Sequence, residues 1–227
     1  MLPMPRNRKP FCDSHWRGDV DQVSRCGLLG FGLALLAACI APSFAWAAAP
    51  ALTVTTVTYK EVGEVKIEAD VYRADDEVVR PVVVSIHGGA LMMGSRKGIH
   101  DKLRDFCQTE GWAIVSIDYR LAPEVKLPTI IEDVQDAFRW LGGEGAKQFN
   151  LDARRLAVVG GSAGGYLTMM TGFCVEPRPT VLVSYWGFGD IDGPWQTQPS
   201  EHYRSGKLIP ETDAREVLRG KVLTNSD

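Results

Sequence analysis

The sequence lacks the features by which metal sites and nucleic-acid-binding proteins are usually recognised. It has no C-x-x-C motif and no group of His and Cys residues with the spacing of a zinc site, so we expect no metal and no cofactor. The formal net charge is only -3 and no block of like charge is present, which argues against nucleic acid as a partner. Internal repeats and low-complexity segments are also missing, and the length suits one domain with its own core.

The first 47 residues are predicted to be a signal peptide with an N-terminal extension, not part of the fold. An uninterrupted apolar run covers residues 27–38, basic residues precede it, and Ala45-Trp46-Ala47 resembles a small-residue cleavage site. The run is short for a membrane span of about 20 residues. An alternative is a bacterial lipobox that ends at Cys39, which would give a lipid-anchored chain. We therefore expect a periplasmic or extracellular protein, with membrane attachment only if Cys39 is lipidated.

Residues 48–227 alternate between strand and helix patterns, as in an α/β protein. Alternating residues in 52–59 and 64–72 predict an antiparallel hairpin. Continuous apolar runs predict buried strands, and helical stripes lie between them, so we expect a mostly parallel sheet with helices on both faces. The expected strands are residues 81–86, 112–117, 156–159 and 181–184. A first helix is expected to end near Gly111, and further helices are expected over 128–141, 163–174 and 210–219.

Two details of this pattern are specific enough to test. Thr129 and Glu132 form a capping box, which predicts that the second helix begins there with Thr129 as N-cap and is stopped by Gly142 and Gly143. After Gly187 the periodicity fades, so residues 187–227 are expected to form a cap-like or inserted segment.

The most informative motif is Gly160-Gly161-Ser162-Ala163-Gly164, which directly follows the apolar run at 156–159. A G-x-S-x-G sequence between a strand and a helix is typical of the sharp turn that presents a nucleophilic serine. The small residues let the turn form without a clash. The backbone N–H of Ala163 and the N-terminus of the following helix would stabilise a developing oxyanion beside Ser162.

A second motif, His87-Gly88-Gly89-Ala90, follows the apolar run that ends at Ile86. Gly88 and Gly89 are expected to supply the opposing N–H groups of the oxyanion hole. His87 precedes the serine, which is the wrong order for the catalytic base of such a fold, so we expect it to brace this loop. His100 is expected to be a surface residue at a helix start.

With these motifs the chain resembles the hormone-sensitive-lipase-like esterases and the neighbouring feruloyl and acetyl esterases of the α/β-hydrolase superfamily. Residues 87–90, the sequence Asp118-Tyr-Arg-Leu-Ala-Pro-Glu124 and residues 160–165 carry this resemblance, which covers about 54–188. It implies a carboxylic-ester hydrolase with Ser162 as nucleophile, an oxyanion hole of Gly88, Gly89 and Ala163, and a small-molecule ester as substrate. Ala90 replaces the commoner third glycine. We expect the 118–124 segment to be an ion-paired structural corner.

The departure from this family lies after the serine. The resemblance implies an acid after a seventh strand and a histidine after an eighth, and the sequence shows no pattern for either strand. The expectation is therefore a partial, C-terminally truncated domain of doubtful activity, in which the edge strand at 181–184 exposes apolar residues. His202 is the only histidine after Ser162, and an improvised triad would pair it with Asp190 or Asp192.

Two other functions remain open at this point. One is an exported serine peptidase of the prolyl-oligopeptidase type, which shares the fold and the serine turn. The other is a hydrolase-like binding protein without catalysis. The His-Gly-Gly loop favours the esterase over the peptidase. The sequence does not indicate an oligomeric state.

Overall fold

A computed structural model describes residues 49–191, 193–194, 198, 209–216 and 220–224. The predicted signal peptide, Cys39, Asp192 and His202 lie outside these residues. Among the helices that are described, none combines the length and the apolar character that a membrane crossing requires.

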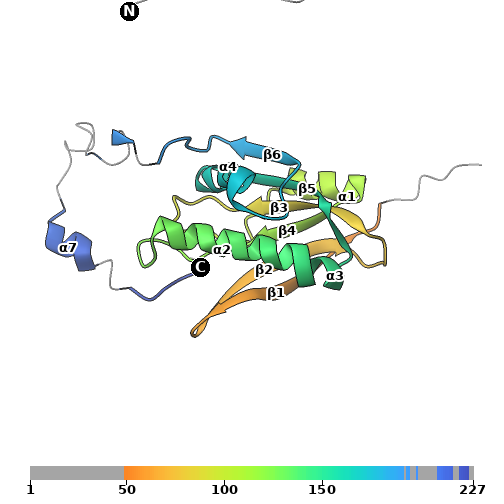
Figure 1. The fold of residues 1–227 in the computed structure, drawn as a ribbon, viewed down its shortest axis with the longest axis horizontal. Coiled ribbons are helices and arrows are strands. Elements are labelled where there is room, and N and C mark those ends of the chain that lie inside the picture. The colour runs from red at the N-terminus through yellow and green to blue at the C-terminus, as the bar shows by residue number, and fades with distance from the viewer. Residues whose placement is uncertain (1–48, 192, 195–197, 199–208, 217–219, 225–227) are drawn as a thin grey trace, which may run out of the picture. The chain divides into compact units, whose positions relative to one another are not determined.

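The described strands form one six-stranded sheet in the order β1-β2-β4-β3-β5-β6 (Figure 1). β1 pairs antiparallel with β2, and β2 pairs antiparallel with β4. The pairs β4–β3, β3–β5 and β5–β6 are parallel. The predicted hairpin and the mostly parallel sheet are thus confirmed. The strands are β1 (Leu52–Val62), β2 (Val65–Ala74), β3 (Arg80–Ile86), β4 (Ala113–Ile117), β5 (Leu151–Gly161) and β6 (Val181–Tyr185).

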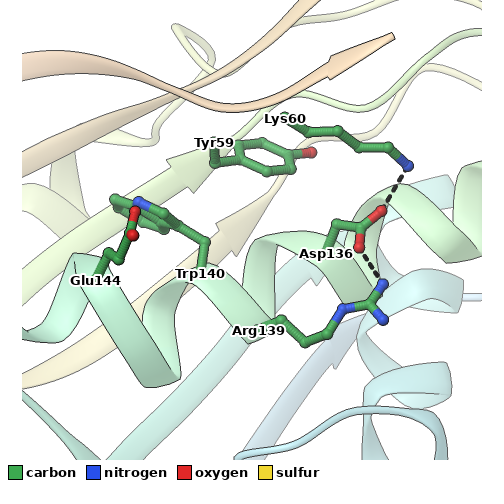
Figure 2. A pocket seen from close by; sticks show the side chains of 6 residues that line it. All are labelled: Tyr59, Lys60, Asp136, Arg139, Trp140 and Glu144. Atoms are coloured by element: carbon green, nitrogen blue, oxygen red, sulfur yellow. Dashed lines mark hydrogen bonds and ion pairs between the residues drawn. The ribbon is translucent and has the colours of Figure 1, made fainter.

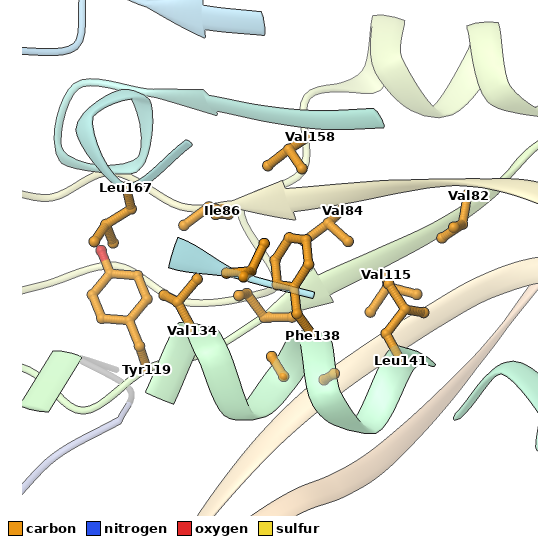
Figure 3. Packing of buried hydrophobic residues seen from close by; sticks show 14 of the residues in the cluster. Val82, Val84, Ile86, Val115, Tyr119, Val134, Phe138, Leu141, Val158 and Leu167 are labelled. Atoms are coloured by element: carbon orange, nitrogen blue, oxygen red, sulfur yellow. The ribbon is translucent and has the colours of Figure 1, made fainter. Parts of the chain in front are cut away.

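Helices cover both faces of the sheet, as expected. Successive residues of β3 point to opposite faces, because side chains alternate along a strand. Val84 belongs to the core under α2 and α4, with Phe138 and Leu167 (Figure 3). Val83 packs with Cys107 of α1 on the other face. The described helices are α1 (Asp101–Glu110), α2 (Leu127–Trp140), α3 (Ala146–Gln148), α4 (Ala163–Cys174) and α7 (Glu211–Glu216), with a π-helical turn at Leu141–Gly145.

The predicted start of α2 was wrong. Its N-cap is Lys126, whose side chain makes no capping bond, and Thr129 lies inside the helix. Pro128 explains the earlier start, because a proline in the first turn has no N–H to satisfy and its φ already suits a helix.

The predicted end of the same α-helix was right to within one residue, since α2 ends at Trp140, but the role predicted for the two glycines was wrong. Gly142 and Gly143 do not stop it, because a π-helical turn carries the chain on to α3. A Cβ on Gly145 would lie 2.8 Å from the Trp140 ring, and one on Gly142 would lie 2.8 Å from Pro177 Cδ. Only glycine allows these contacts, and the packing offsets the roughly 1 kcal/mol by which glycine disfavours a helix.

β6 is the exposed edge that the sequence predicted. All five of its residues are exposed, with Val181 at 48 % and Tyr185 at 50 % of their full accessibility. The strand contains no charged residue and no proline, which are the usual means of protecting an edge. Within the part of the chain that the structure describes, no strand pairs with its outer side. The cap-like character of residues 187–227 stays a prediction, since much of that segment lies outside the described residues.

Candidate active site

Ser162 is the single residue between the end of β5 and the start of α4. Its backbone has φ 56° and ψ -121°, a conformation that residues with a side chain rarely adopt. Such strain costs on the order of 1–3 kcal/mol and persists only where the surroundings impose it. The Ser162 N–H donates to Tyr185 O at 2.9 Å, and its carbonyl accepts from Tyr166 N at 3.0 Å. The turn is therefore held by both β6 and the first turn of α4.

Two glycines allow this turn to pack against its neighbours. A Cβ on Gly160 would lie 2.7 Å from Thr168 Oγ1 and closer still to the backbone of Gly164. A Cβ on Gly164 would lie 2.6 Å from His87 O and closer still to Ile86 O. The α4 N-terminus thus sits directly against the end of β3, which only glycine permits.

The Gly88 loop lies beside Ser162. β3 and β5 are parallel neighbours with Ile86 opposite Gly160, so the chain leaves both strands at the same edge of the sheet. A Cβ on Gly88 would lie 3.5 Å from Ser162 Cβ and 2.8 Å from Gly161 O. The structure therefore brings together the serine turn and the loop that the sequence predicted to face it.

The loop itself has an unusual backbone. Gly89, Ala90 and Leu91 all have positive φ, at 110°, 54° and 64°. Gly89 O accepts from the N–H groups of Met92 and Met93, so this carbonyl is used inside the loop. Among the residues that the structure describes, the hydrogen bonds of Gly88 and Gly89 use their carbonyls and leave their N–H groups without a partner. Ala163 opens α4, and the first N–H groups of a helix have no partner within it.

His87 braces this loop, as expected. Its Nδ1 donates to Gly88 O at 2.8 Å. Its ring stacks on Tyr119 with centroids 4.2 Å apart and planes 7° apart, and Tyr119 Oη donates to His87 O at 3.0 Å. Burial lowers the pKa of His87 to about 4, so the ring is neutral at neutral pH. Among the described residues its Nε2 has no hydrogen-bond partner and lies 3.9 Å from Asp118 Oδ1.

The segment after β4 forms the ion-paired corner that the sequence predicted. Asp118 is buried and accepts from the backbone N of Arg96 at 2.7 Å and from Arg96 Nη1 at 2.5 Å. Burial raises the pKa of Asp118, and the Arg96 bonds oppose that shift. Arg96 also donates from Nε to Asp70 at 2.9 Å. Arg120 makes a separate buried pair with Asp133.

The BD-FAE family model matches residues 69–182, which is half of the chain. The chain belongs to this family of α/β-hydrolase esterases. An esterase from Pyrobaculum calidifontis is 31 % identical, with a TM-score of 0.53 over 69 % of this chain and 55 % of that one. An α/β-hydrolase enzyme from the Lake Arreo metagenome is 28 % identical, with a TM-score of 0.53 over 62 % of this chain and 46 % of that one. The expected resemblance to α/β-hydrolase esterases is thereby confirmed.

Curated sequences that match this BD-FAE domain include fungal polyketide synthases. A non-reducing polyketide synthase of Preussia isomera is 37 % identical over 158 residues, which are 64 % of this chain and 7 % of the synthase. Another from Penicillium rubens is 31 % identical over 69 % of this chain and 7 % of the synthase. The chain spans less than a tenth of the length of these curated relatives and about half of the Pyrobaculum esterase.

The BD-FAE domain does not show the acid and the base in its described part. Asp192 and His202 lie outside it, and Asp190 is an exposed residue that follows β6. Of the two histidines that are described, His87 is engaged in the loop, and His100 is the exposed N-cap of α1, where it accepts from Lys102 N. The pairing of His202 with Asp190 or Asp192 stays a prediction.

Two hollows of the BD-FAE domain lie away from Ser162. One, of about 450 Å³, is lined by β1 and α2 with the following turn (Figure 2). Its Lys60 is neutralised by Asp133 and Asp136. The other, of about 620 Å³, lies at the amino ends of β3, β4 and β6. Neither contains a residue of the serine turn or of the Gly88 loop, so the chemistry of Ser162, and not the size of a hollow, identifies the candidate site. The 450 Å³ hollow is lined by Tyr59, Lys60, Asp136, Arg139, Trp140 and Glu144.

Sequence reasoning missed two residues that hold the site together. It did not identify Arg96 as the partner of Asp118, and it gave Tyr119 no contact with His87. Both contacts join segments that are 22 and 32 residues apart, and no local pattern indicates them. The only available signal in the sequence was that Arg96 is the single arginine in the glycine-rich loop after β3.

The pKa of His87 leads to a test of stability. Because the folded pKa is about 4 and the ordinary value is 6.5, the unfolded chain takes up a proton first as the pH falls. The stability from neutral His87 is therefore complete above about pH 6.5 and is lost down to about pH 4, a loss of about 3 kcal/mol. Between about pH 6.5 and pH 4, the unfolding free energy measured in urea should fall by about 3 kcal/mol more in wild type than in His87→Asn. Asp118 contributes with the opposite sign in both proteins, so equal declines would contradict the prediction.

Proposed function

We propose that this BD-FAE domain hydrolyses carboxylic esters with Ser162 as its nucleophile. The observation that carries the proposal is the strained Ser162 turn packed against the Gly88 loop, with an ideal Cβ of Gly88 only 3.5 Å from Ser162 Cβ. A strained serine between strand and helix is the arrangement in which Oγ is exposed at the edge of an α/β-hydrolase sheet. The family membership and the Pyrobaculum esterase support the class of reaction.

In this mechanism Ser162 Oγ attacks the ester carbonyl carbon and gives its proton to a base. The carbonyl oxygen becomes an oxyanion that accepts hydrogen bonds from the N–H groups of Gly88, Gly89 and Ala163. The intermediate collapses, the alcohol leaves with the proton, and an acyl group remains on Ser162. Water then repeats the sequence and releases the acid. Each N–H donor of this kind typically contributes about 3 kcal/mol to the transition state.

The surroundings of Ser162 favour small or aryl esters as substrates. The Trp186 ring is 79 % exposed, and its atoms lie 3.7–3.8 Å from the Cβ position of Gly161. Tyr185 packs beside it, with ring centroids 5.7 Å apart. These exposed rings next to the serine turn offer an apolar surface to an acyl or aryl group.

The protein is proposed to act outside the cytoplasm, on the N-terminal apolar run and cleavage pattern alone.

A fluorophosphonate probe tests the proposal, because it labels only an activated serine. The probe should label Ser162, and Ser162→Ala should not be labelled. The same substitution should lower the rate of p-nitrophenyl acetate hydrolysis at least about 10³-fold. Ser184→Ala is the matched control, since its Oγ lies near the same helix and donates to Gly165 O at 3.0 Å. That variant should keep the label.

Each alternative has its own outcome in this experiment. A chain that is folded but not labelled at Ser162 would be a binding protein, and the proposal would fail. Labelling with cleavage of proline-containing peptide amides, but not of esters, would indicate the peptidase. His202→Ala tests separately whether His202 is the catalytic base. If this variant is still labelled at Ser162, the role of His202 is refuted and that of Ser162 is not affected.

A further inference from the structure

The segment after β4 holds the Gly88 loop at three points. Tyr119 Oη donates to His87 O at 3.0 Å. Ala122 N donates to Leu91 O at 2.7 Å. Asp118 accepts from Arg96 at the far end of the loop. The loop needs such support, because three successive residues, 89–91, have positive φ and two of them are not glycine.

The first contact acts on a particular peptide group. The carbonyl of His87 and the N–H of Gly88 belong to the same planar peptide unit, and in the trans form they point in opposite directions. A hydrogen bond from Tyr119 Oη to His87 O therefore fixes the direction of the Gly88 N–H. The peptide between Gly88 and Gly89 is held in the same way, because His87 Nδ1 donates to Gly88 O and so fixes the Gly89 N–H.

Tyr119 controls both peptide groups. Its hydroxyl holds the first directly, and its ring lies flat against the imidazole that holds the second, 4.2 Å away. Tyr119 itself is fully buried and lies two residues after the end of β4, so burial and the nearby strand fix its position. Hydrogen bonds in such a chain also polarise one another, which strengthens the N–H groups at its end as donors.

We propose that Tyr119 is a positioning residue of the oxyanion site, which holds the two peptide groups that present the N–H donors of Gly88 and Gly89 to the substrate. The proposal rests on the proposed function, because the donors act only if Ser162 attacks an ester. Tyr119 touches neither the substrate nor Ser162 and acts through His87 and the loop.

Tyr119→Phe tests this with little change in shape, since the ring and its stack on His87 remain. Removing the hydroxyl frees the His87–Gly88 peptide, so kcat for p-nitrophenyl acetate should fall about 10-fold with KM within about two-fold, because the donors act on the transition state. Tyr59→Phe is the matched control. Tyr59 is also a tyrosine whose hydroxyl donates to a carbonyl, but this carbonyl belongs to Asp118, at 2.7 Å, and not to a residue of the loop.

Both variants should lower Tm by a similar amount, about 3 °C, and only Tyr119→Phe should lower kcat. A second measurement does not depend on activity. The backbone ¹⁵N resonance of Gly88 responds to the hydrogen bond on the preceding carbonyl, so it should shift in Tyr119→Phe and stay in place in Tyr59→Phe. Equal kcat in the two variants, or a Gly88 resonance that does not move, would overturn the proposal. An inactive wild type would refute the proposed function, and the resonance would still decide whether Tyr119 orients this peptide.

Discussion

Gly164→Ala is expected to prevent stable folding of the domain. The added methyl would lie 2.6 Å from His87 O and closer to Ile86 O, and both are backbone atoms that cannot move aside like the end of a side chain. Relief would require α4 to move away from the end of β3, which would open the core around Leu167. We expect a loss of more than about 3 kcal/mol of unfolding free energy, measured by urea denaturation.

Gly143→Ala is the control for this substitution. Gly143 lies in the π-helical turn, and nothing lies within 4 Å of its Cβ position. The same change should there be neutral or stabilise the domain by up to about 1 kcal/mol, because alanine restricts the unfolded chain and favours helix. A Gly164→Ala protein as stable as Gly143→Ala would mean that α4 does not approach β3 as closely as described.

Asp133→Asn is expected to cost about 3 kcal/mol of unfolding free energy. Asp133 is completely buried, and its two oxygens accept from Lys60 Nζ at 2.6 Å and from the backbone N, Nε and Nη2 of Arg120 at 2.6–3.1 Å. An amide keeps the volume but removes the charge that balances two partly buried cations. Breaking a buried pair on one side typically costs 3–5 kcal/mol.

Asp136→Asn provides the comparison, because Asp136 lies three residues after Asp133 in the same helix. Asp136 is partly exposed and pairs with Lys60 and Arg139, and Lys60 keeps Asp133 when Asp136 is changed. Its loss should cost less than about 1 kcal/mol, as for other exposed pairs. Thermal unfolding of both variants measures the difference, and similar Tm values would show that Asp133 is not the centre of this network.

The parts of the fold that the sequence predicted are those with a local cause. The start of α4 follows from the glycine turn. The hairpin follows from two alternating segments on either side of Gly63, Val with Thr in β1 and charged with apolar residues in β2. The position of Gly88 beside Ser162 could be predicted because both motifs directly follow parallel strands, whose carboxyl ends share one edge.

The errors arose where packing between distant residues decides the structure. The turn after α2 continues because Trp140 and Pro177 pack on Gly145 and Gly142, and a pattern of two glycines cannot indicate that. The contacts of Tyr119 with His87 and of Asp118 with Arg96 were missed for the same reason, since they depend on β4 lying next to β3 in the sheet. The capping box of Thr129 was a real local signal that the proline before it overruled.

The strand order also determines when the site can form during synthesis. The Gly88 loop leaves the ribosome first, after β3, and β4 follows with Tyr119 and Asp118, which fix the loop. Only then does β5 deliver Ser162, and β5 adds to the free side of β3. The Ser162 N–H donates to Tyr185 O at the end of β6, so the bonds that hold the strained serine turn are complete only after β6 has also been made.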